Sequence, residues 1–340
     1  MQPNETSRPA FRSTLSQLEL RSPPLPHTLL EAMELIDRPD QLEVEPVIEM
    51  VQRDPIVVAR LLQIVNSAYY GLQRSIDSVD RAVVLLGPVA VTGIVLGMNM
   101  LKLRSALEGP ASHCFIRLIR HSIATAFLTR HLMEGPPRLG TPHNRLRRTG
   151  TSFTAGLLHD FGKIILVYNF PREAVELYEQ RVYEEQIRTD DIRSLEQLLF
   201  GYDHTEAGEY VARKLGFPEI LVNVIRLHHE PVPGTGDAET DHLIRTTVAA
   251  DLTAKALGYP FHDRVSREQC LAHPVWREVC AGTSARPAPE ALSQELQAVR
   301  EHLDAYVRHM TASLSSPPSA EARARKRNFR GLPGPNVPRS

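Results

Sequence analysis

The sequence predicts an all-α protein, and three observations lead to this prediction. Apolar residues recur three and four positions apart, as on one face of a helix, and Val57, Leu61 and Val65 are typical. Helix-start signals recur, such as Asp54-Pro55, in which an N-cap residue precedes proline at the first helical position. No segment alternates polar and apolar residues as a half-buried strand would. We therefore expect a helical protein with two lobes.

The composition bears on location and partners. The 340 residues are 42% hydrophobic and 23% charged, as in soluble globular proteins, and the formal net charge is -1. That charge gives no bias toward nucleic acid or acidic membranes. The three cysteines form no CxxC pair and are odd in number, which favours a reducing compartment, and the N-terminus lacks the apolar core of a signal peptide. We expect a cytoplasmic protein that contacts neither membrane nor nucleic acid.

One stretch resembles a membrane helix by composition. Residues 82–101 carry no charge and include Gly93-x-x-x-Gly97. However, Gly87-Pro88 divides the stretch, because glycine ends helices and proline begins them well. We interpret it as two core helices, at about 78–86 and 88–103.

The elements before residue 107 follow in order. Residues 1–22 are polar and contain prolines, so we expect a flexible N-terminus. Asn66-Ser67-Ala68 is interpreted as a structural turn, since no base lies beside it in sequence. The helical patterns of this half lie at 29–36, 44–51 and 55–65 and then in the two core helices.

The second half is predicted to contain helices that carry most of the histidines. His121 lies in a long helix at about 114–133, and a basic, proline-rich loop follows at 135–150. Asp203-x-x-Glu206 resembles a capping box, with His204 in the first turn of its helix. Three further predicted helices carry candidate site residues: one contains His159-Asp160, one begins at Pro218 and ends at His228-His229, and one at 240–257 contains Asp251. The remaining predicted helices lie at 171–183, 192–200 and 289–314.

The most informative stretch runs from Gly156 to Lys163 and contains the His159-Asp160 pair between apolar residues. An ionised carboxylate is rarely buried without a partner. Asp160 therefore requires either a metal ion or a nearby cation such as Lys163. The sequence leaves both alternatives open.

Taken together, these segments resemble the HDOD domain, a signalling relative of the HD metal-dependent phosphohydrolases. The matching residues form two blocks: Pro23-Pro24-Leu25-Pro26, Asp54-Pro55, Leu61-Leu62-x-x-Val65-Asn66-Ser67-Ala68 and 82–87; then Arg120-His121-Ser122, 156–163, Asp203-His204 with Gly208, and Pro218 to His228-His229. The resemblance implies an HDOD domain at 23–260, with an N-terminal helical half at about 23–107 and an HD-like helical bundle at about 111–260. The resemblance does not explain the last 80 residues, in which the residue pattern predicts a helical extension at 261–314 and the composition predicts a disordered basic tail at 315–340.

The resemblance also implies a metal site. One metal would be held by His121, His159, Asp160 and Asp251, and a second by His204, His228 and His229. Imidazole and carboxylate donors without thiolates suit Fe, Mn, Ni, Co or Zn. In an active enzyme, Asp160 would serve catalysis and Lys163 would contact the phosphate.

Helix geometry raises an objection to this ligand set. Neighbours on a helix point about 100° apart, so His159 with Asp160, and His228 with His229, would share a metal only near the edge of a site. One residue of each pair would then act as a supporting or capping group. Arg117, one turn before His121, stands where some HD enzymes have an added carboxylate. It would repel a second cation or contact a phosphate.

Two functions are compatible with these residues. The first is a regulatory module that binds signalling proteins, with a metal or a phosphorylated nucleotide in a vestigial HD site. The second is a metal-dependent phosphohydrolase or cyclic-dinucleotide phosphodiesterase. We favour the first, because His228-His229-Glu230 is followed by Pro231 and not by the Gly-Tyr-Pro signature of the phosphodiesterase branch. Metal binding is expected in either case only if the His/Asp residues converge.

Overall fold

A computed structural model gives the fold. It describes residues 44–67, 70–134, 149–181, 191–230, 232–279 and 289–311, together with Glu31, and throughout these ranges the regular elements are helices. The prediction of an all-α protein is thus confirmed. Several expectations lie outside the described residues: the flexible N-terminus, the helix at 29–36 except for Glu31, which is helical, the loop at 135–150 except for its last two residues, which belong to a helix, and the basic tail.

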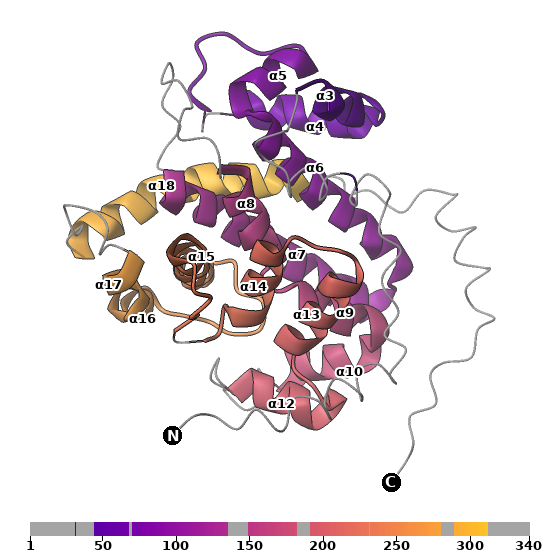
Figure 1. Ribbon diagram of the computed structural model, residues 1–340, viewed down its shortest axis with the longest axis vertical. Coiled ribbons are helices and arrows are strands. Elements are labelled where there is room, and N and C mark those ends of the chain that lie inside the picture. Colours follow the sequence, from indigo (N-terminus) through magenta and orange to yellow (C-terminus); the bar gives the residue numbers. More distant parts are fainter. Residues whose placement is uncertain are drawn as a thin grey trace.

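Within the described residues, the N-terminal lobe (Figure 1) consists of α3 (Val44–Gln52), α4 (Pro55–Val65) and α5 (Val79–Leu86). The predicted start of α4 is confirmed, because the Asp54 carboxylate accepts a hydrogen bond of 2.9 Å from the backbone N–H of Ile56. The turn after α4 is held by Asn66, whose side-chain amide bonds both to the N–H and to the C=O of Ile76. Asn66 therefore has the structural role that the sequence predicted.

Helix α6 (Pro88–Lys102) carries the apolar stretch into the interior. Gly87, with φ of 83°, separates it from α5 as predicted. The stretch Pro88–Ala106 is long and apolar enough to cross a membrane, but 78% of its apolar window is buried inside the fold. On α6, a Cβ at Gly93 would lie 2.9 Å from the Phe153 ring, so the glycine allows close helix packing. These contacts are those of a core helix.

The HD-like half is built around α7 (Gly109–Glu134), which packs along α8 (Thr149–Leu158) and α15 (Ala238–Ala256). Gly156 on α8 lies so close to α7 that a Cβ atom there would be 2.6 Å from the Cα of Ala126. The structure corrects one prediction here. His159 and Asp160 do not lie inside a helix but in a turn between α8 and α9 (Phe161–Asn169).

The remaining helices of this half complete the surroundings of that turn. Helix α10 (Pro171–Val175) continues into a π-helical segment, η5 (Glu176–Arg181), where one longer helix was expected. The predicted capping box at Asp203 and Glu206 is present and opens α13. The helices that follow η5 are α12 (Asp191–Phe200), α13 (His204–Lys214) and α14 (Glu219–Leu227).

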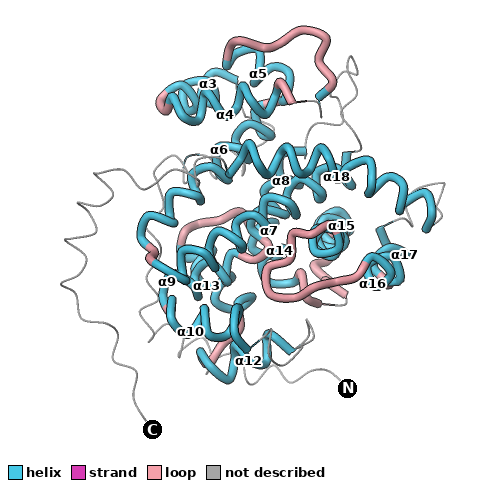
Figure 2. Tube along the Cα trace, turned by 180° about the vertical axis from the view of Figure 1, so that it is seen from behind, coloured by secondary structure: helices cyan, strands magenta, loops and turns pink. Residues whose placement is uncertain are grey.

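The C-terminal helix α18 (Pro289–Thr311) lies between the N-terminal lobe and the HD-like half in both views (Figures 1 and 2). Its Tyr306 packs on Phe127 and Phe153, and the guanidinium of Arg130 lies over the same aromatic group. Before it, α16 (Arg267–Ala272) and α17 (Val275–Val279) pack on α15. Buried apolar side chains of both lobes and of α18 form one continuous core. The domain boundaries near 107 and 260 stay a prediction.

Candidate metal centre

The turn between α8 and α9 places both members of the His159-Asp160 pair on the same centre. Asp160 has φ of -95° and ψ of 23°, outside the helical geometry on which the 100° objection was based. Nε2 of His159 lies 3.4 Å from an Asp160 carboxylate oxygen. The predicted angular restriction is therefore wrong for this pair, because α8 ends at Leu158 and both residues lie in the turn that follows.

A first group of donors consists of His121 from α7, Asp251 from α15 and the His159-Asp160 pair. Nε2 of His121 lies 3.0 Å from Oδ1 of Asp251 and 3.8 Å from Oδ2 of Asp160. Nε2 of His159 lies 3.9 Å from the same Asp251 oxygen. The structure thus brings together the four residues that the resemblance assigned to one metal.

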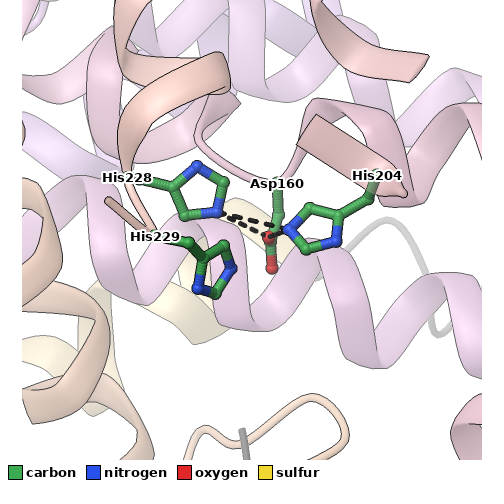
Figure 3. Close-up of side chains that lie close together, drawn as sticks. All are labelled: Asp160, His204, His228 and His229. Carbon is green, nitrogen blue, oxygen red and sulfur yellow. Dashed lines mark hydrogen bonds and ion pairs between the residues drawn. The ribbon is translucent and has the colours of Figure 1, made fainter. Parts of the chain in front are cut away.

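A second group lies on the other oxygen of Asp160 (Figure 3). Oδ1 of Asp160 is 3.6 Å from Nε2 of His204 and 3.4 Å from Nε2 of His228. His229 lies beside them, with its ring centroid 4.2 Å from that of His228. Because α14 ends at Leu227, the His228-His229 pair also lies in a turn and both rings reach the same group. Asp160 is shared by the two groups.

The far nitrogens of the imidazoles explain their orientation. Nδ1 of His121 lies 2.8 Å from the carbonyl oxygen of Tyr259. Nδ1 of His159 lies 2.8 Å from that of Gly156, and Nδ1 of His228 lies 3.0 Å from that of Ile225. A carbonyl oxygen only accepts, so Nδ1 carries the proton and Nε2 presents its lone pair to the centre. This is the arrangement typical of metal-binding histidines.

Whether a metal fits the centre can be judged from the hydrogen bonding of the donor atoms. Five of them are buried and form no hydrogen bond of good geometry within the described part of the chain: Nε2 of His121, His159 and His229, and Oδ1 of Asp160 and Asp251. Two of these oxygens have an ion-pair contact, because Asp160 Oδ1 lies 2.9 Å from Nζ of Lys163 and Asp251 Oδ1 lies 3.0 Å from Nε2 of His121. Buried polar atoms are nearly always hydrogen-bonded, so these atoms of the two groups indicate a missing partner. A divalent cation satisfies nitrogen and oxygen lone pairs together. The residues present fit a metal.

Two buried lysines also face the centre. Nζ of Lys163 lies 2.9 Å from the Asp160 carboxylate, and Nζ of Lys255 lies 2.9 Å from both Asp251 and Asp263. Burial would raise the pKa of Asp160, but Lys163 and His159 hold that pKa well below its usual range. Lys255 and His121 do the same for the pKa of Asp251 against its burial. Both carboxylates are therefore ionised, as metal ligation requires.

Burial dominates the titration of the histidines. It lowers the pKa of His159 to about 3 in spite of the neighbouring carboxylates, and it lowers the pKa values of His204 and His229 well below their usual range. These imidazoles are neutral at pH 7. A neutral imidazole is the form that binds a metal.

Three supporting residues carry no signal in the sequence pattern: Glu196, Lys255 and Asp263. Glu196 on α12 is fully buried, and its pKa is raised to about 7 by burial. It accepts hydrogen bonds from the Tyr178 hydroxyl at 2.6 Å and from the backbone N–H of His204 at 2.8 Å. Each missed residue lies in a segment with ordinary charge spacing, and only tertiary packing buries it.

Packing between helices explains why glycine stands at position 162, two residues after Asp160. A Cβ atom at Gly162 would lie 1.6 Å from the carbonyl oxygen of His204, so α9 and α13 touch backbone to backbone. Gly208 on α13 faces the same contact. This close approach carries His204 to Asp160.

Arg117, which the sequence suggested could repel a second cation or contact a phosphate, binds other groups of the protein. Its guanidinium lies 3.3 Å from the Glu179 carboxylate and donates to the carbonyl oxygen of Phe261. Cys114, three residues earlier on α7, is buried, and burial raises the pKa of its thiol to about 12. It is therefore a core thiol.

Comparison with known proteins places the chain in a family. Residues 22–231 match the HDOD domain, which is more than half of the chain. The chain belongs to the HDOD family. An uncharacterized protein of Treponema pallidum (strain Nichols) is 24% identical over 274 residues, which cover 80% of this chain. The HDOD chain spans 50% of the length of that relative.

Solved structures share the HDOD fold. An HDOD domain protein of unknown function from Geobacter sulfurreducens superposes with a TM-score of 0.68 at 22% identity, covering 90% of this chain and 99% of its own. A candidate signal transduction protein from Marinobacter aquaeolei VT8 gives 0.63 at 20% identity, covering 89% and 66%. A candidate phosphohydrolase from Shewanella amazonensis SB2B gives 0.59 at 19% identity, covering 88% and 98%. At these identities the likeness concerns the fold alone.

Proposed function

We propose that this HDOD protein is a regulatory module that acts through contacts with signalling proteins and binds a divalent metal at its His/Asp centre. The helices α3 to α6 contribute none of the donor side chains described above. A lobe of that size, which the centre does not use, favours a role in protein recognition. The description of one fold relative as a candidate signal transduction protein agrees with this.

The position of Lys163 carries the choice of a regulatory module over an enzyme. Its side chain is 2% exposed, and its ammonium lies 2.9 Å from Asp160. Contact with a phosphate would require this lysine to leave a buried carboxylate, which is costly. Asp251, the more open of the two ligand carboxylates, exposes only 11% of its side chain. In this conformation the centre suits an ion better than a phosphodiester.

The lysines also make reversible metal binding plausible on physical grounds. Asp160 and Asp251 each have a lysine at 2.9 Å, so neither carboxylate is left as a lone buried charge without metal. A protein that is folded with and without the ion can respond to it. A phosphorylated nucleotide reaching the metal through its phosphate oxygens is the other ligand that we consider for the same centre.

The alternative is a metal-dependent phosphohydrolase or cyclic-dinucleotide phosphodiesterase. One observation favours it: both oxygens of Asp160 face separate groups of histidines, as in sites where two metals share a carboxylate. Bound metals would supply Lewis-acid chemistry and an activated water. The chain's own contribution would then be His121, His159, Asp251 and the second histidine group as ligands, with Lys163 released toward the phosphate.

An assay separates the two functions. The purified chain is supplied with Mn²⁺ and tested on a generic phosphodiester and on cyclic dinucleotides, beside His159→Ala. We expect the wild type to show no turnover above that variant. Metal-dependent turnover that disappears in His159→Ala would refute the regulatory interpretation and support the hydrolase.

The protein contacts are tested separately. The full chain is immobilised and exposed to extract from its own source, once with Mn²⁺ and once with a chelator. We expect signalling proteins to be retained to different extents in the two conditions. Identical retention with and without metal would contradict a metal-responsive module.

A further inference from the structure

Glu196 differs from the other groups that hold the histidines. Its Oε2 lies 2.6 Å from Nδ1 of His204, whereas Nδ1 of His121, His159 and His228 faces backbone carbonyls. A carboxylate behind an imidazole fixes the ring more firmly than a neutral carbonyl and makes the far nitrogen more basic. Within the described residues, the histidines of the centre thus have unequal support.

The position of Glu196 is itself held from two sides. Its other oxygen accepts a bond of 2.6 Å from the Tyr178 hydroxyl, and the backbone N–H of His204 donates to Oε2 at 2.8 Å. Glu196, Tyr178 and His204 have no solvent exposure. No lysine or arginine forms an ion pair with Glu196 within the described part of the chain, and the contact of its Oε2 with Nδ1 of His204 is its ion-pair contact there.

We propose that Glu196 is the positioning residue for His204. It turns Nε2 of His204 toward Oδ1 of Asp160 (Figure 3), and tight metal binding at the His204, His228 and His229 group depends on it. The group of His121, His159 and Asp251 does not depend on Glu196. This inference rests on the proposed metal centre and adds that the two halves are supported differently.

The test is a calorimetric titration of the full-length chain with Mn²⁺. Wild type is expected to bind two ions. Glu196→Gln keeps the shape but removes the charge, and it should weaken one site by about 10- to 100-fold while leaving the other unchanged. Adding Asp251→Asn to Glu196→Gln should weaken the surviving site as well, which locates that site at the first group.

Glu206→Gln is the matched control. Glu206 caps the same helix through the N–H of Asp203 at 2.9 Å, and glutamine can also fill that capping position. The control should bind both ions like wild type. Equal weakening of both sites in Glu196→Gln, or no change in either, would overturn the assignment. A wild type that binds no metal would overturn the metal centre itself, which is a distinct result.

A second variant covers the case in which Glu196→Gln does not fold, as judged by circular dichroism. Tyr178→Phe removes only the hydroxyl that anchors the other oxygen of Glu196. It should weaken the same single site by a smaller factor. Unchanged binding in Tyr178→Phe, with Glu196→Gln unfolded, would count against the proposed role.

Discussion

Asp160 has contacts on both of its carboxylate oxygens, and these decide what the centre can do. One oxygen faces His121 and His159, the other faces His204 and His228, and Lys163 compensates the charge. Burial lowers the pKa of His159 to about 3 and that of His204 well below its usual range, so these two imidazoles are neutral. Neutral donors around an ionised acid form a site for a cation, and they also make the protein sensitive to acid.

The acid sensitivity can be predicted with its sign. Burial lowers the pKa of His159 and of His262 to about 3, whereas the pKa of each imidazole is about 6.5 in the unfolded chain. Between about pH 6.5 and 3 the unfolded state binds more protons, so stability falls as the pH falls. Each histidine contributes at most about 1.4 kcal/mol per pH unit. The pKa of Glu196 is raised to about 7, so the folded state takes up a proton at this residue on acidification, which offsets the effect of one histidine.

The measurement is urea unfolding of metal-free protein from pH 7 to pH 4. We expect the free energy of unfolding to decrease steadily over this range, and His262→Gln to reduce the slope by about one proton. His262 lies outside both donor groups, so the variant keeps the proposed ligands. Stability that is constant or rises on acidification would refute this account of the buried histidines.

At this scale the sequence predicted which histidines and aspartates would gather, through the order of its motifs. It did not predict Glu196 or Lys255. A glutamate in an amphipathic helix, or a lysine four residues after an aspartate, is ordinarily solvated. Both are buried here because α12 and α15 are covered by other helices, which no local pattern reveals.

Among the elements, the contact between α9 and α13 positions the second donor group. Gly162 and Gly208 let the two helices approach until their backbones touch. The approach carries His204, the first residue of α13, to the turn that contains Asp160. A side chain at this contact would have no space.

Gly162→Ala should therefore be strongly destabilising. Its Cβ would lie 1.6 Å from the carbonyl oxygen of His204, and backbone cannot yield as a side chain can. We expect a loss at or above the upper end of about 1–3 kcal/mol, with weaker metal binding at the second group. Chemical denaturation and Mn²⁺ titration measure both effects.

Gly97→Ala provides the comparison. It also adds a Cβ to a buried helical glycine, but the atom that it meets is the flexible end of Met310, at 2.8 Å. Met310 can move, so the loss should be clearly smaller. Equal losses in the two variants would mean that the α9–α13 contact is not special.

Some helix boundaries are predicted by local sequence signals and others are not. The start of α4, the break at Gly87 and the capping box of α13 were predicted, because caps and breakers are local signals. The end of α8 was not, because apolar residues lie on both sides of His159-Asp160 between Phe153 and Val167 and no proline interrupts them. The turn at His159 has no local signal, and it is this turn that lets both His159 and Asp160 face the metal centre.

Across the whole molecule, α18 joins the two lobes. Figure 2 shows it beside α6 and α8, beneath the N-terminal helices. Tyr306 is 1% exposed, and its ring lies 5.1 Å from Phe127 and 6.0 Å from Phe153. The resemblance to HDOD proteins left this helix unexplained, since an amphipathic pattern does not say which surface it will cover.

Tyr306→Ala should destabilise the entire protein. Removing a buried aromatic ring costs about 3–5 kcal/mol, and the continuous core predicts one unfolding transition that shifts as a whole. Glu301→Ala, at an exposed position of the same helix, should change stability by less than about 0.5 kcal/mol. Thermal unfolding followed by circular dichroism and by tyrosine fluorescence gives the comparison. Two transitions, with only one shifted by Tyr306→Ala, would show that the lobes are independent.

The central claim is that one carboxylate serves two metal-binding groups, and Mn²⁺ titration of wild type beside Asp160→Asn tests it most directly. Asp77→Asn, at a carboxylate whose side chain is 82% exposed, is the control. We expect two ions per chain for wild type and for the control, and loss of both in Asp160→Asn. Absence of metal binding in wild type, or wild-type binding by Asp160→Asn, would contradict it.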